Sequence, residues 1–113
     1  MSYIDGFVVS ARDRDAYQAF AARMAPILRQ YGALRVVEGW GTDVPHGERT
    51  DLYRAVAAEE GESVVFAWVE WPDRAARDDG WARIMADGAM PPGDAPFDTK
   101  RMIFGGFDTI VDA

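Results

Sequence analysis

The stretch SVVFAWVEW, Ser63–Trp71, is the most apolar segment of the chain and decides the predicted fold. Side chains alternate between the two faces of a strand. One face would carry Val65, Ala67, Val69 and Trp71, and the other would carry Val64, Phe66, Trp68 and Glu70. Only a strand in the middle of a sheet is apolar on both faces. We therefore expect this segment at the centre of a sheet.

Further strands and helices are predicted on either side of this segment from the period of their apolar residues. The strands cover residues 3–10, 34–41 and 101–111, and the helices cover residues 13–31, 50–60 and 72–88. Residues 50–60 would also alternate as a strand, and Pro26 is expected to bend the first helix. The order βαββαβ, with an insertion between the second and third strands, predicts an α+β, ferredoxin-like domain spanning residues 1–113, with a four-stranded antiparallel sheet and two helices on one face.

One face of the predicted sheet is left uncovered, because two helices on the same side cover only the other face. Phe66 and Trp68 lie on one side of the central strand and Val65 and Val69 on the other, so neither face is polar. An apolar surface of this extent is not usually left in water. We therefore expect a symmetric homodimer in which two sheets pack face to face.

Charge and composition limit the partners of the chain. Asp and Glu total 19 against 12 Lys and Arg, and the formal net charge of −7 disfavours nucleic acid and anionic lipid. No apolar run approaches the roughly 20 residues of a membrane span, and no signal-peptide pattern is present, so we expect a cytoplasmic protein. The absence of cysteine excludes disulfides, thiolate metal sites and a cysteine nucleophile.

Four stretches that together span nearly the whole chain carry a resemblance. They are YIDGFVV, GALRVVEGWGTDVPHG, TDLYRAVAAEEGESVVFAWVEWP and PFDTKRMIFGGF. The chain resembles the uncharacterised YbaA-like family, a domain-of-unknown-function group of the dimeric α+β barrel superfamily. The resemblance implies the fold, the dimer and a small cavity in each protomer, but no activity and no catalytic residues. The superfamily includes cofactor-free quinol monooxygenases, muconolactone isomerase-like proteins, haem-binding or haem-degrading proteins and small ligand-binding or stress-response proteins.

Three carboxylates in predicted strands are the candidate catalytic residues: Asp5, Glu38 and Glu70. Each alternates in phase with aromatic residues, and the candidate ligand contacts are Phe7, Trp40, Phe66 and Trp68. If these positions all face the interior, the carboxylates meet in an aromatic pocket that raises at least one pKa, as a general acid or base requires. The alternative is that they pair with arginines, for which Arg35, Arg54 and Arg101 are available, and only fix strand register and dimer. Glu38 is the predicted centre of any functional site.

Other features of the sequence point away from metal and phosphate chemistry. His46, the only histidine, lies in a turn with Pro45 and Gly47 and has no second ligand at metal spacing. The glycines of FGGF, residues 104–107, lack the pattern of a phosphate loop and predict a bulge or a close strand contact. We expect no cofactor and no metal. The loop at residues 89–97, rich in proline, is expected to be mobile and to border the mouth of the cavity.

Three classes of function fit these features. The first is a cofactor-free small-molecule enzyme, an oxygenase or an isomerase, with Glu38 or Asp5 as the base. The second is a non-catalytic protein that binds a small apolar or aromatic metabolite. The third is a structural or stress-associated dimer with a filled core. The three classes differ in whether the carboxylates line an open cavity or form ion pairs.

Overall fold

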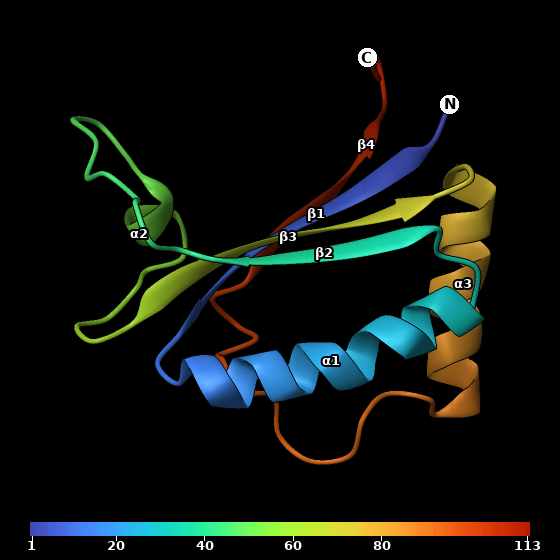
Figure 1. The fold of residues 1–113 in the computed structure, drawn as a ribbon, viewed down its shortest axis with the longest axis horizontal. Helices are drawn as coiled ribbons and strands as arrows, with labels where there is room; N and C mark the ends of the chain where they lie inside the picture. The colour runs from blue at the N-terminus through green and yellow to red at the C-terminus, as the bar shows by residue number, and fades with distance from the viewer.

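The computed structural model describes residues 1–113 and confirms the predicted α+β, ferredoxin-like arrangement. Its elements are β1 (Tyr3–Ala11), α1 (Arg14–Gln30), β2 (Arg35–Trp40), α2 (Leu52–Ala55), β3 (Ser63–Trp71), α3 (Arg74–Asp87) and β4 (Ile103–Asp108). The strands form one antiparallel sheet in the order β2-β3-β1-β4, so β3 is an interior strand as predicted. Helices α1 and α3 lie on the same side of the sheet (Figure 1). We call that side the helix face and the other the open face.

Capping residues set the ends of the two long helices. Asp13 accepts a hydrogen bond from the Ala16 amide, at 3.0 Å, at the start of α1, and Asp73 accepts one from the Ala76 amide, at 2.7 Å, at the start of α3. Gly88 ends α3 with a positive φ of 61°, which glycine adopts without steric cost. No helix of the structure has the length and apolarity needed to cross a membrane.

Two local predictions need correction. The helix expected over residues 50–60 is limited to Leu52–Ala55. The Asp51 carboxylate caps its start at the Arg54 amide and also accepts from the Gly47 amide, and the chain leaves the helix before Ala57, which has a positive φ of 48°. The apolar period of residues 72–88 predicts that Met85 is buried on α3, but its side chain is 68% exposed. The Trp71 ring packs so closely on the backbone at Gly80 that a methyl group there would collide with it, so the side of α3 near Gly80 faces the sheet instead.

The core lies mainly between the helix face and the two long helices. One cluster consists of Tyr3, Met24, Leu28, Ala33, Val69, Trp71 and Ile84, and a second of Val9, Ala11, Tyr17, Ala21 and Val65. A third cluster, of Val8, Val56 and Val64, lies on the open face, where the insertion around α2 covers one end of the sheet. The rest of the open face has no covering element in the chain (Figure 1).

The glycines of β4 make a close contact and no bulge. Gly105 and Gly106 pair in regular register with Gly6 and Asp5 of β1. A side chain at Gly106 would collide with the Tyr3 hydroxyl and with the guanidinium that packs beside it. The close contact expected at FGGF is therefore confirmed, and its role is packing.

Arg101 connects three segments of the chain near the end of β1. Its guanidinium donates to both carboxylate oxygens of Glu62, at 2.7 and 2.9 Å, to the Ala57 carbonyl, at 2.9 Å, and to the Ser10 hydroxyl, at 3.0 Å. Its Nε also donates to Asp98, at 3.1 Å. The Arg101 hydrogen bonds hold the pKa of Glu62 at about 2. One of the arginines proposed from sequence is thus structural, with Glu62 as its partner.

The Glu62–Arg101 pair should make the fold acid-sensitive. Because the folded pKa of Glu62 is lowered from 4.5 to about 2, its stabilisation is fully present above pH 4.5 and is lost as the pH falls towards 2. We expect the free energy of unfolding, from urea titrations across this range, to fall less steeply with decreasing pH in Glu62→Gln than in the parent protein. Equal pH slopes in the two proteins would contradict this assignment.

Candidate functional site

A cavity of about 260 Å³ lies between the helix face of the sheet, α1 and the loop that follows α3. We call it the inner cavity. Of its 15 lining residues, 13 are hydrophobic, and Glu38 is the only carboxylate among them. Met90, Ala95 and Phe97 close it from the loop side, which confirms that this loop borders the cavity. The mobility of the loop stays a prediction.

Glu38 and Tyr17 form the polar part of this cavity. The amphipathic stripe of α1 turns Tyr17 towards the sheet, and the register of β2 places Glu38 beside Ala67 on the helix face. The Tyr17 hydroxyl donates a hydrogen bond of 2.7 Å to Oε1 of Glu38. Glu38 takes part in no ion pair, so the arginine pairing considered from sequence does not apply to it.

Both groups have pKa values moved by their surroundings. Burial raises the pKa of the Glu38 carboxyl above its ordinary value, and the hydrogen bond from Tyr17 opposes part of that shift. Burial, followed by the nearby Glu38 charge, raises the pKa of Tyr17, so its phenol stays protonated. The Glu38 side chain is exposed, but it lines two cavities, where the crowding of neighbouring atoms limits its hydration. A carboxyl whose pKa is raised in this way is a candidate for acid–base chemistry.

Asp5 lies on the helix face but serves the core. It is 6% exposed, and its Oδ2 accepts hydrogen bonds from the indole nitrogens of Trp71 and Trp81, each at 3.0 Å. The Nε of Arg77 lies 2.9 Å from Oδ1, close enough for an ion pair although the N–H is poorly aligned for a hydrogen bond. The same guanidinium stacks over the Tyr3 ring. For Asp5 the structural alternative holds, with Arg77 as its partner.

Glu70 faces the opposite side of the sheet, so the three carboxylates do not meet. It accepts a hydrogen bond of 3.3 Å from the Trp68 indole, and its neighbour across the strands is Arg35. Phe66 shares this open face and is 52% exposed. The expected pocket of three carboxylates is wrong, because the strands that carry Glu38 and Glu70 present them to different faces.

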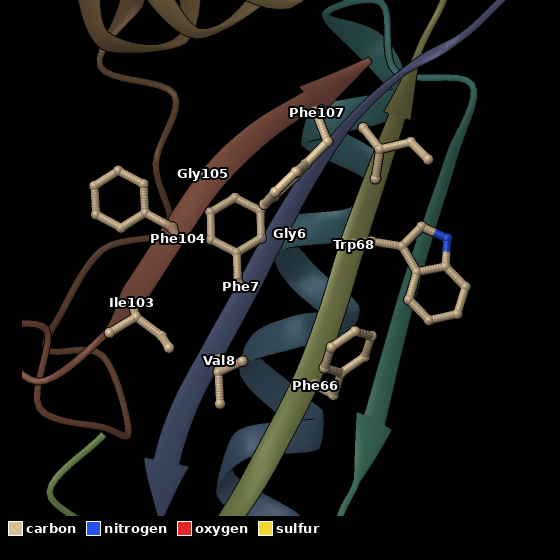
Figure 2. Close-up of a pocket in the computed structure, with 10 residues that line it drawn as sticks. Gly6, Phe7, Val8, Phe66, Trp68, Ile103, Phe104, Gly105 and Phe107 are labelled. Atoms are coloured by element: carbon tan, nitrogen blue, oxygen red, sulfur yellow. The ribbon is translucent and has the colours of Figure 1, made fainter. Parts of the chain in front are cut away.

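The candidate ligand contacts divide in the same way. Phe7 lines the inner cavity and also the hollow described next, and Trp40 lines the polar cavity beside Glu38. Phe66 and Trp68 instead border a hollow of about 500 Å³ on the open face, which Figure 2 shows with α1 lying behind the sheet. Its floor is flat at Gly6, and the Phe107 ring lies over that glycine. No titratable side chain lines this larger hollow, so it offers no acid–base chemistry.

Sequence reasoning missed two residues that decide these environments. The apolar period of residues 13–31 includes Tyr17 and therefore predicts only a packing role for it, although a buried tyrosine hydroxyl usually finds a hydrogen-bond partner. Arg77 lies four residues before Trp81 on α3, a spacing that places both on one side of the helix and could have indicated their shared partner. His46 is exposed and stacks on Tyr53 with the ring centroids 4.7 Å apart, in agreement with a loop histidine.

Comparisons with known proteins agree with the resemblance in the sequence. The family model described as "Protein of unknown function (DUF1428)" matches residues 2–99. The "Uncharacterized protein YbaA" of Escherichia coli K12 is 50% identical over 116 residues, covering 99% of each chain, and the proteins of that name in E. coli O157:H7 and Shigella flexneri match equally well. The chain belongs to the DUF1428 family.

Proposed function

We propose that the inner cavity binds a small, largely apolar molecule and that Glu38 transfers a proton to or from it without a cofactor. The observation that carries this proposal is the setting of the Glu38 carboxyl. It faces an apolar cavity, receives one side-chain hydrogen bond, from Tyr17, and forms no ion pair. A charged group in such surroundings lowers stability unless it is paired. An unpaired carboxyl that is kept at this cost points to a function.

The size of the inner cavity limits the ligand to a small molecule. An engineered apolar cavity of roughly 150 Å³ in another protein binds benzene. A volume of about 260 Å³ therefore holds one substituted ring or a short branched chain. Carbon acids with an activated C–H next to a carbonyl, and phenols, are the substrates of this size that a carboxylate base can deprotonate.

The arrangement allows a complete proton transfer. Glu38 takes the proton from carbon. The C–H electron pair becomes the new C=C bond, and the π pair of the carbonyl moves onto the oxygen, giving an enolate. Once Glu38 is protonated, it no longer holds the Tyr17 hydroxyl as a charged acceptor. The hydroxyl can then donate a hydrogen bond to the enolate oxygen. Glu38 then returns the proton to a different carbon, which is an isomerisation, or to the same one, which is exchange. Neither outcome changes the oxidation level of the substrate.

A second candidate function is binding without turnover, favoured by the 13 hydrophobic residues of the lining. In that case the neutral Glu38 carboxyl would donate a hydrogen bond to the ligand. The two candidates use the same cavity and differ only in whether protons are exchanged.

Deuterium incorporation into phenylacetone in D₂O, followed by NMR, separates the two candidates. Its benzylic C–H lies between a ring that the cavity can hold and a carbonyl. Exchange faster than in buffer and proportional to protein concentration supports proton transfer. Line broadening of phenylacetone without added exchange supports binding alone. If phenylacetone shows neither added exchange nor line broadening, the result contradicts a ligand site in the inner cavity.

We also propose that a second copy of the chain covers the open face. Phe66 and Phe107 are 52% and 59% exposed there, beside Trp68 and Ile103 of the same hollow (Figure 2). Apolar surface of this extent favours association, and a two-fold axis lying between two facing sheets would pair the hollow with its own copy.

The dimer predicts a mass of about twice 12.5 kDa by light scattering coupled to gel filtration. Phe66→Asp should shift the protein towards the monomer at micromolar concentration, because the new charge would be buried at the interface. Met85→Asp, an equally exposed apolar position on α3, is the matched control and should stay dimeric. A parent protein that remains monomeric would overturn the dimer.

A further inference from the structure

A second cavity, of about 300 Å³, adjoins the Glu38–Tyr17 pair on the side away from the inner cavity. We call it the vestibule. The first turns of α1 supply Arg14 and Gln18, and the end of β2 supplies Trp40. Tyr17 and Glu38 line both cavities, so they stand at the junction between an apolar space and a polar one.

Arg14 is the one cation that lines either of these cavities. Arg12, Arg54, Arg77 and Arg101 are all engaged in ion pairs elsewhere, whereas the Arg14 guanidinium forms neither an ion pair nor a side-chain hydrogen bond. It precedes Tyr17 by three residues, a spacing that puts both on the same side of α1. An uncommitted guanidinium beside a recess is suited to hold a carboxylate with two parallel hydrogen bonds.

We infer that the ligand is a short carboxylic acid with an apolar tail, whose carboxylate is bound in the vestibule by Arg14, with Gln18 as a further donor. This inference rests on the proposed function and narrows its substrate class. The tail would fill the inner cavity, so the carbon that joins tail and carboxylate would pass the Glu38–Tyr17 pair. The reacting C–H would therefore lie between the apolar group and the acid group.

Tyr17, Glu38 and Trp40 line the vestibule together with Arg14. A ligand carboxylate beside Arg14 would therefore share this cavity with the Glu38 carboxylate. Two carboxylates in one cavity repel one another, so removing the Glu38 charge should tighten the binding of an acid. A neutral ligand of the same shape should not respond to that change.

The test uses two probes with the same apolar body, 3-phenylpropionate and 3-phenyl-1-propanol, with dissociation constants measured by calorimetry. The parent protein should bind the acid about tenfold more tightly than the alcohol, in line with a partly solvated charge-assisted pair. Arg14→Gln should remove that preference and leave the alcohol unchanged. Arg23→Gln, an exposed arginine of α1 outside both cavities, is the matched control and should change neither.

The outcomes separate this inference from the function on which it rests. Equal binding of both probes by the parent protein, or an equal loss for both in Arg14→Gln, would overturn the carboxylate site and leave the inner cavity as a ligand site. Failure of both probes to bind would overturn the carboxylate site together with the proposed function. Tighter binding of the acid in Glu38→Gln, with binding of the alcohol unchanged, would add support for a ligand carboxylate bound in the same cavity as Glu38.

Discussion

Asp5→Ala is expected to lower the free energy of unfolding by about 3–5 kcal/mol, the range found when one partner of a buried ion pair is removed. The change leaves the Arg77 guanidinium without its buried counter-charge. It also leaves the indole N–H groups of Trp71 and Trp81 without an acceptor, and each unsatisfied buried donor carries a further cost. Urea denaturation at one fixed protein concentration measures the loss, because a dimer would make stability depend on concentration.

Asp5→Asn is the informative companion. The asparagine oxygen can still accept from the two indoles, so the loss should be smaller than for alanine and should reflect mainly the missing charge. A loss below about 1 kcal/mol for Asp5→Ala, the range of an ordinary surface substitution, would contradict the buried network.

Glu38→Gln should behave in the opposite way, with activity lost and stability kept. General acid–base catalysis contributes about 10²–10⁴-fold in rate, so exchange of phenylacetone should fall by at least 10²-fold. Glutamine keeps an oxygen that accepts the hydrogen bond from Tyr17. It also removes the negative charge of a carboxyl whose pKa is raised by burial. Above the ordinary pKa of glutamate that charge costs stability. Because the Glu38 side chain is partly exposed to solvent, the gain should be no more than about 1 kcal/mol.

Glu70→Gln is the matched control for this variant, because Glu70 also lies in a strand and accepts a tryptophan hydrogen bond but faces the other side of the sheet. It should leave exchange in the inner cavity unchanged. Tyr17→Phe should reduce exchange while leaving the Glu38 carboxyl in place, since it removes the donor to the enolate oxygen. A Glu38→Gln variant that loses several kcal/mol of stability with exchange unchanged would make Glu38 a structural residue.

The order of elements and the sheet followed from local patterns. Apolar periods fixed β1, β3 and α1 closely, and capping acids such as Asp13 and Asp73 set helix starts. The pattern could not say which face of each strand meets the helices, because β3 is apolar on both. That ambiguity is why Glu70 was grouped with Glu38.

Contacts between distant segments account for the remaining differences. Arg77 reaches Asp5 from α3, and Arg101 reaches Glu62 across 39 residues, so no local pattern could distinguish these two arginines from the ten other positively charged residues. The short α2 depends on the Asp51 cap and on Arg54, which donates to carbonyls of the preceding loop. Just beyond α2 the Ala57 carbonyl accepts from Arg101, a tertiary hydrogen bond that outweighs the helix preference of the alanines there.

The pKa of Glu38, measured by NMR titration of its side-chain carboxyl carbon, tests the proposed site most directly. We predict a value above the 4.5 of an ordinary glutamate, because burial disfavours the charged form more than the Tyr17 hydrogen bond favours it. In Tyr17→Phe the pKa should rise further, because the one group that stabilises the carboxylate is gone. A Glu38 pKa at or below 4.5 in the parent protein would show a well-solvated or paired carboxylate and would contradict a proton-transfer site in the inner cavity.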